Sequence, residues 1–445
     1  MFDNLFQHPI ATITVDGTAV KKSALRSLSN THPHIIGLIC CVHSLNLLMK
    51  HLVNKVPWMS HTLDESKKII KFFKNRQRPR EILKIEYPKQ LSLPPETRFC
   101  YSLLALKGLS EASNALKSLA RATITENAAL SSMQKEWVRL HQDYQSNDKK
   151  KLVVIQDILR DYTYYPRLES MIKILFPIYL LLRVFDRCAT MGCGWLFCSI
   201  LHLRHVLEKT IQAEFTTLSV VGIGEASSIV DDRLRYIAIP RIILAFFLHP
   251  PAVLATTSLL LEGFWEECSP RTQSEKSLEI SYQFYESLFQ TAPTEVKNQA
   301  KKEFQEFQAF CRGSSAWSTH HETQVSSRFP IISKLITRLV SSPAVSSPSE
   351  RSFSTTRRIE KGDRNRLSEK MTEMLSFINV NMRARIPKVP ISWADLEKAL
   401  YSNQIQLPDL DEPSILELSN GDIDDDSDIF NPPIAAIIIK TTSQG

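Results

Sequence analysis

A long stretch of helix-forming sequence constrains this chain most, because it leaves little room for another architecture. From Tyr101 to about Phe310, apolar residues recur at helical spacings, as in Leu103, Leu106 and Leu109. Helix breakers are few in this stretch, and the 445-residue chain contains only 12 glycines. We therefore predict a fold that is mainly α with a small α/β part.

The first fifty residues differ from this stretch, because they carry a β-α-β pattern. Residues 11–15 are mostly β-branched and end at Asp16, residues 19–29 have a helical pattern, and residues 35–43 form a continuous apolar run suited to a buried strand. Asp16 at a strand end is placed to project into a crevice, although aspartate is also common in turns for local reasons.

Cys40 and His43 close this segment and allow two interpretations. They are a zinc half-site, or else a packed or phosphate-facing pair, since one C-x-x-H pair lacks two further ligands at suitable spacing.

Positive charge gathers after this segment. Eight cations lie within eighteen residues, against the single acid Glu81, and they are Lys67, Lys68, Lys71, Lys74, Arg76, Arg78, Arg80 and Lys84. Apolar residues between them can dock on the body, so the cations form either a DNA-backbone surface or a solvated helix face. Residues 406–430 contain nine acids and no Lys or Arg, which makes the rest of the chain more basic than its net charge of +7.

The C-terminal region carries two further apolar patterns. Residues 329–340 predict a helix with Pro330 at its first position and Ile332, Leu335 and Leu339 on one face. Residues 347–350 form a capping box, and a helix after Arg366 would align four apolar residues: Leu367, Met371, Met374 and Ile378.

The motif around residues 349–354, Ser-Glu-Arg followed by Phe353 and Ser354, resembles the C-terminal dimerisation region of hAT-superfamily transposases, as does Arg364–Leu367. The segment TVDGTAVKKSA, followed by a Cys-x-x-His-Ser-Leu-Asn-Leu run, is similar to the core of that family. The matching residues there are Asp16, Cys40, His43 and Asn46. Thr97-Arg98-Phe99 and the segment ending in Trp317 resemble two further family signatures.

The resemblance implies a ribonuclease H-like core interrupted by an all-α insertion. Residues 1–99 would form part of that core with the basic helix, and residues 100–312 the insertion. Residues 313–386 would form the dimerisation region. For residues 387–445 the sequence pattern itself predicts an acidic, largely disordered extension with one helix at 393–401.

The resemblance also implies roles for particular residues. Asp16 and Glu350 occupy catalytic positions at which the family holds Mg²⁺ or Mn²⁺ for DNA strand cleavage and transfer. Arg98, Arg364 and Arg366 join the basic helix as candidate DNA contacts, and Phe99 is a candidate base-stacking aromatic. Self-association would use Ile332, Leu335, Leu339, Phe353, Leu367, Met371, Met374 and Ile378.

The family places a first catalytic aspartate three strands and a helix before the second. Only fifteen residues precede Asp16, so we predict an N-terminally truncated, catalytically inactive protein that needs no cofactor, self-associates and touches DNA. The alternatives are an active transposase whose gene model lacks its N-terminus, and a domesticated regulatory or protein-interaction factor.

We expect a nuclear protein with no small-molecule substrate. The first twenty residues lack a secretory signal, and the eight cysteines follow no disulfide spacing. Two apolar stretches, 171–182 and 242–264, are interrupted by Lys173 and by His249-Pro250-Pro251, so we predict buried helices rather than membrane spans.

Overall fold

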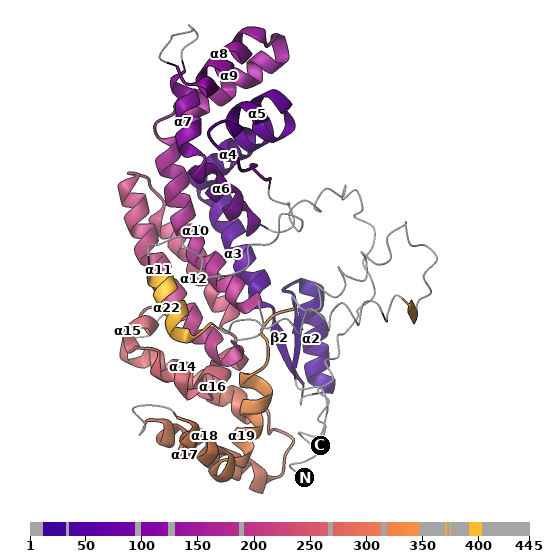
Figure 1. The fold of residues 1–445 in the computed structure, drawn as a ribbon. Coiled ribbons are helices and arrows are strands. Elements are labelled where there is room, and N and C mark those ends of the chain that lie inside the picture. The colour runs from indigo at the N-terminus through magenta and orange to yellow at the C-terminus, as the bar shows by residue number, and fades with distance from the viewer. Residues whose placement is uncertain are drawn as a thin grey trace.

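The computed structural model shows a mainly α-helical chain with one small parallel sheet (Figure 1). It describes residues 12–32, 35–93, 99–122, 130–186, 191–265, 270–312, 318–346, 370–371, 374 and 391–402. The mainly-α fold class is confirmed, whereas the ribonuclease H-like core and the domain boundaries remain predictions.

The sheet consists of β1 (Thr12–Val15) and β2 (Ile36–Ile39), joined by helix α2 (Ala19–Thr31). The strands are parallel, and the register places Thr12 opposite Ile36. Helix α2 packs closely on β2, because a Cβ added at Gly37 would lie 2.9 Å from Leu25 Cδ2. Glycine at this position therefore sets how near the helix lies to the sheet.

The predicted strand at 35–43 is wrong beyond Ile39, because helix α3 begins at Cys41. The partner strand β1 ends at Val15, whose carbonyl accepts the last hydrogen bond, 2.7 Å from Cys40 N. Pairing with β1 ends at that point, and the apolar run continues as a helix. Apolar runs alone do not distinguish the two outcomes.

The remaining described elements are helices, and they confirm the predicted all-helical middle. They are α3 (Cys41–Lys55), α4 (Pro57–Asn75), α5 (Gln77–Lys84), α6 (Tyr101–Glu111), α7 (Ser113–Arg121), α8 (Ser132–Asp143), α9 (Ser146–Arg160), α10 (Tyr164–Asp186), α11 (Cys193–Thr217), α12 (Ile223–Ile237), α13 (Pro240–Phe247), α14 (Pro250–Leu254), α15 (Ser258–Leu261), α16 (Pro270–Ser287), α17 (Thr294–Arg312), α18 (Thr319–Arg328), α19 (Pro330–Leu335), the π-helix η1 (Ile336–Val340) and α22 (Trp393–Tyr401).

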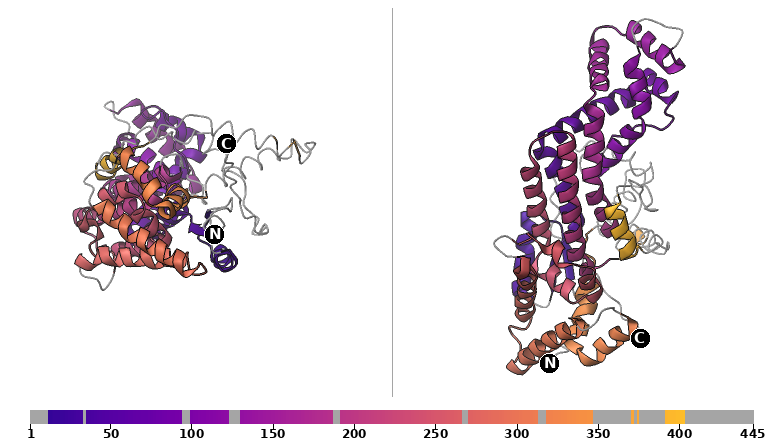
Figure 2. Two further views of the ribbon diagram at one scale, coloured as in Figure 1. Left: turned by 90° about the horizontal axis from the view of Figure 1, so that it is seen from below. Right: turned by 90° about the vertical axis from the view of Figure 1, so that its left-hand side faces the viewer.

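Helices α10 and α11 form the centre of the molecule. Helix α10 packs against α3, α6 and α11, and α11 packs against α12 and α13. The molecule is elongated, with α8 and α9 at one end and α17 and α18 at the other (Figures 1 and 2). Both apolar stretches, 171–182 and 242–264, are largely buried in this body as predicted. Among the described helices, none is long and apolar enough to cross a membrane.

Two predicted helices are divided. The basic stretch 67–84 breaks at Arg76, which is extended, because Pro79 lacks the N–H that would bond to Asn75 in a continuous helix. The predicted helix 329–340 starts with Pro330 at its first position, as expected, but changes from α to π geometry at Ile336.

Candidate functional site

The C-terminal region docks on the N-terminal sheet through residues 341–346, here called the strap. Thr14 Oγ1 donates to the Pro343 carbonyl at 3.1 Å, and Cys41 N donates to the Ala344 carbonyl at 2.8 Å. Ser346 N lies 3.3 Å from Cys40 Sγ, which accepts its hydrogen bond. The strap thus runs along β1 toward the carboxyl ends of both strands.

Helix α11 supports the strap from the other side. Cys193 N donates to the Ser342 carbonyl at 2.9 Å. A Cβ added at Gly194 would lie 2.6 Å from Val340 Cγ1, so two glycines at the start of α11 (Gly192 and Gly194) let η1 approach closely. The strap is therefore fixed on the sheet and on the helical body at once.

Asn46 connects another sequence segment to the same region. Its Oδ1 accepts a hydrogen bond from Cys100 N at 2.9 Å, which ties α3 to the residue next to Phe99. Cys40, Asn46 and Phe99 therefore act as packing and hydrogen-bonding residues here, and Phe99 lies partly buried against the core. The segment 12–47 therefore contacts both 99–100 and 341–346, although up to 330 residues separate the contacting pairs.

Asp16 lies at the carboxyl end of β1 and is paired with Lys21, whose Nζ is 2.5 Å from Oδ2. Partial burial alone would raise the pKa of Asp16, but the Lys21 ammonium and the hydrogen bonds from Thr18 outweigh it and lower the pKa. Asp16 is therefore an ionised carboxylate whose charge is balanced by a neighbouring cation.

Helix α12 contributes residues near Asp16 that the sequence did not suggest. The Lys22 ammonium lies 4.2 Å from the centroid of the Tyr236 ring. Arg233 Nη2 lies 3.1 Å from His51 Nδ1. Burial is the main cause that lowers the pKa of His51, and the positive charge of Arg233 lowers it further. These residues lie about 180 to 215 positions apart, so only the tertiary fold brings them together.

Comparison with known proteins identifies the C-terminal part of this site. Residues 314–382 match the family model of the hAT family C-terminal dimerisation region. This region of the chain is similar to that of the hAT transposases. No curated protein matches the chain. The strap lies within the matched residues, and so do helices α18 and α19, and the match supports self-association.

Three of the residues predicted for self-association are buried inside the molecule. Ile332, Leu335 and Leu339 are 0 to 2% exposed and belong to the continuous core. In this conformation the three side chains pack into the core of the same chain, so they are not accessible to a second chain. Met371 and Met374 are exposed, at 40% and 48%. Phe353, Leu367 and Ile378 lie outside the described residues, as do Glu350, Trp317, Arg98, Arg364 and Arg366.

The eight cations of the predicted basic stretch fall into two groups, of which one forms ion pairs with described carboxylates. Arg76 and Arg78 pair with Asp148 and Asp143 at 3.1 and 2.9 Å, and Arg80 and Lys84 both contact Glu81. Within the described part of the chain, four lysines of α4 have no ion-pair partner: Lys67, Lys68, Lys71 and Lys74. We call these four residues the α4 lysine face.

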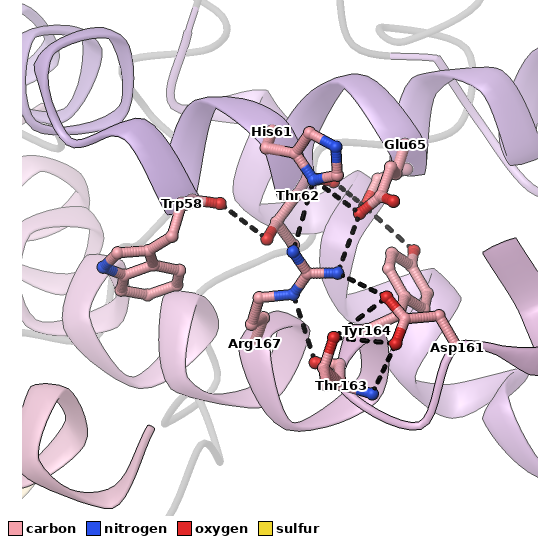
Figure 3. Close-up of polar contacts among 9 residues, drawn as sticks. Trp58, His61, Thr62, Glu65, Asp161, Thr163, Tyr164 and Arg167 are labelled. Carbon is pink, nitrogen blue, oxygen red and sulfur yellow. Dashed lines mark hydrogen bonds and ion pairs between the residues drawn. The ribbon is translucent and has the colours of Figure 1, made fainter. Parts of the chain in front are cut away.

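A buried polar cluster fixes α4 against α10 (Figure 3). Arg167 donates to Asp161 at 2.8 Å and to Glu65 at 3.3 Å, and its Nε donates to the Thr163 carbonyl. Glu65 is 9% exposed and Arg167 16%, so this pair is shielded from solvent. The cluster holds the middle of α4 and thereby sets the direction in which the α4 lysine face points.

The described residues do not fit a divalent metal centre in this conformation. Asp16, for which the family resemblance implies metal binding, has its carboxylate engaged by the Lys21 ammonium in this conformation. In the part of the chain that the structure describes, no three His, Cys, Asp or Glu side chains gather.

Proposed function

We propose that this chain is an hAT transposase-derived protein that self-associates through its C-terminal region. It binds the phosphate backbone of DNA and does not cleave the strands. The observation that carries the proposal is the match of residues 314–382 to the dimerisation region, together with the docking of the strap on the N-terminal sheet. A dimer built through this region would carry two copies of the whole helical body.

Self-association needs exposed apolar contacts within the matched region. Met371 and Met374 supply them, because a large apolar side chain that is 40% or more exposed gains free energy when a second chain covers it. The interior residues Ile332, Leu335 and Leu339 hold the base of the region in place.

The α4 lysine face is the proposed DNA contact. Four ammonium groups on one helix, with no ion-pair partner among the described residues, can neutralise phosphates and release condensed counterions, which favours binding without sequence preference. Lys68 and Lys71 are exposed, and Lys67 and Lys74 are half-buried. Backbone binding of this kind is the reason for placing the protein in the nucleus.

The proposed lack of cleavage rests on Asp16. A carboxylate already neutralised by Lys21 would have to give up that partner before it could bind a metal ion. The alternative, an active transposase, has one observation in its favour. The strap ends at Ser346 beside Cys40, and four residues of chain span at most about 14 Å, so Glu350 is within reach of the carboxyl ends of the strands.

One binding experiment tests the DNA contact. The variant Lys67→Gln/Lys68→Gln/Lys71→Gln/Lys74→Gln should bind a 30-base-pair duplex about tenfold or more weakly at low salt. The slope of log affinity against log salt should shrink by about three to four. The matched control replaces Lys276, Lys297, Lys301 and Lys302, exposed lysines of α16 and α17 at the other end of the molecule, and should bind as the wild type does.

A duplex affinity that is the same in both variants, or that ignores salt, would exclude the α4 lysine face as the contact. The cleavage part is tested separately. Purified protein with Mg²⁺ or Mn²⁺ should leave duplex DNA intact. Metal-dependent nicking that disappears in Glu350→Gln would establish the active transposase instead.

A further inference from the structure

Helix α22 has a direction that the contacts fix. The Trp393 ring stacks on Trp195 with centroids 4.9 Å apart, and the Tyr401 hydroxyl contacts His202 Nδ1 at 3.0 Å. Trp195 precedes His202 on α11 just as Trp393 precedes Tyr401 on α22, so the two helices run in the same direction. Leu396 and Leu400 are 1% and 3% exposed, which shows that α22 is packed on the body.

This direction leads the chain toward α4. Beyond the position of Tyr401, α11 continues to Phe215, whose ring meets Trp58 at the start of α4 with centroids 5.6 Å apart. About ten residues of α11 and about thirteen of α4 separate Tyr401 from the middle of the α4 lysine face, a path of roughly 35 Å at 1.5 Å per helical residue.

The chain that follows is acidic and long enough to cover this path. Residues 403–439 contain no Lys or Arg and nine acids, which are Asp409, Asp411, Glu412, Glu417, Asp422, Asp424, Asp425, Asp426 and Asp428. At about 3.4 Å per extended residue, Asp409 lies up to roughly 24 Å beyond Ser402 and Asp424 up to roughly 75 Å. The acids therefore span the distances at which the lysines lie.

The receiving surface matches this segment in charge. The α4 lysine face carries four positive charges without a described ion-pair partner, whereas the neighbouring cations of α5 already have carboxylates. The exposed Asp64 lies on the same side of α4, one helical turn before Lys67 and Lys68. Lys149 and Lys150 lie beside the end of α4, because Arg76 pairs with the adjacent Asp148.

We propose that the acidic segment 409–428 docks on the α4 lysine face of its own chain and competes there with nucleic-acid phosphates. The competition rests on the proposed function, but the docking does not. The short tether from α22 gives the segment a high effective concentration, so weak individual ion pairs suffice to hold it. The segment would thus set the salt concentration and DNA concentration at which the lysine face becomes available.

Lysine footprinting tests the docking without DNA. The full-length chain is compared with a full-length variant in which the nine acids are replaced by Asn or Gln. Brief treatment with acetic anhydride and mass spectrometry report each lysine. Lys67, Lys68, Lys71 and Lys74 should react about fivefold or more faster in the neutralised variant, because the acids no longer cover them. Lys297 and Lys301 on α17 should react equally in both proteins.

Equal reactivity of the α4 lysines in the two proteins would overturn the docking. Protection that grows with protein concentration would overturn it as well, because a second chain would then supply the segment. Duplex binding is measured on the same pair, and the neutralised variant should bind about tenfold tighter. Protected lysines in a protein that binds no DNA in either form would leave the docking standing and refute the proposed function instead.

Discussion

His249 is a residue whose ionisation should make the fold sensitive to acid. It lies between α13 and α14, and its ring meets Trp195 edge-on with centroids 4.9 Å apart. Its buried Nδ1 has no hydrogen-bond partner among the described residues. Burial lowers the pKa of His249 from 6.5 to about 4. The neutral ring is therefore the form that the folded chain accepts.

The sign of the pH dependence follows from this lowered pKa. Between about pH 6.5 and 4 the unfolded chain binds the proton first, so the free energy of unfolding is highest above pH 6.5 and decreases as the pH falls. At pH 5 the contribution of this group is a loss of about 2 kcal/mol. Urea unfolding at pH 8 and pH 5 measures it, and His249→Leu should reduce the difference by that amount. An unchanged difference in the variant would assign the acid sensitivity to other groups.

At the scale of elements, the contact between η1 and the start of α11 holds the dimerisation region on the body. A Cβ at Gly192 would lie 3.0 Å from Ser341 Cα, in a place where backbone rather than a movable side chain is the neighbour. Because α11 cannot shift without disturbing the core, the strap would have to move.

Gly192→Ala should therefore lower the free energy of unfolding by about 2 kcal/mol. It should also remove hydrogen-exchange protection from Cys193 and Cys41, whose amides bond to the strap. Gly224→Ala in α12 is the matched control, since a Cβ there meets nothing within 4 Å, and it should be neutral or slightly stabilising. Similar protection in both variants would show that the strap tolerates the extra methyl group.

Elements with strong periodicity could be predicted from the sequence, and contacts between distant segments could not. Helix α22 has the predicted bounds, and Pro330 begins α19 as expected, because both depend on local spacing and local caps. The end of β2 depends on where β1 ends, and the pairing of Arg76 depends on Asp148. Neither can be deduced locally, since the partners lie 24 and 72 residues away in sequence.

At the candidate site, the order of motifs in the sequence indicated which residues to consider, but it did not predict their contacts. The sequence indicated Asp16, Cys40 and Asn46 as signature residues of one family. The structure shows that Cys40 binds the strap and that Asn46 binds the start of α6. The pairing of Asp16 with Lys21, and the contacts of Tyr236 with Lys22 and Arg233, follow only from the structure.

At the scale of the whole molecule, the proposed function depends on self-association. The matched region is anchored at the strap, while α22 fixes the chain again on α11 through Trp393 and Tyr401. The described residues on either side of 347–390 are therefore fixed on the same body. Two bodies joined by self-association would bring two α4 lysine faces to one DNA molecule, which increases avidity.

Sedimentation equilibrium of the full-length chain at micromolar concentration tests this claim most directly. We predict a mass of twice 50.8 kDa for the wild type. Met371→Glu/Met374→Glu should sediment as the monomer with unchanged thermal stability, because both side chains are exposed. Val153→Glu/Val154→Glu, which alters two similarly exposed residues of α9, should remain a dimer. A wild-type mass of 50.8 kDa at every concentration, or a methionine variant that still sediments at twice that mass, would contradict the account.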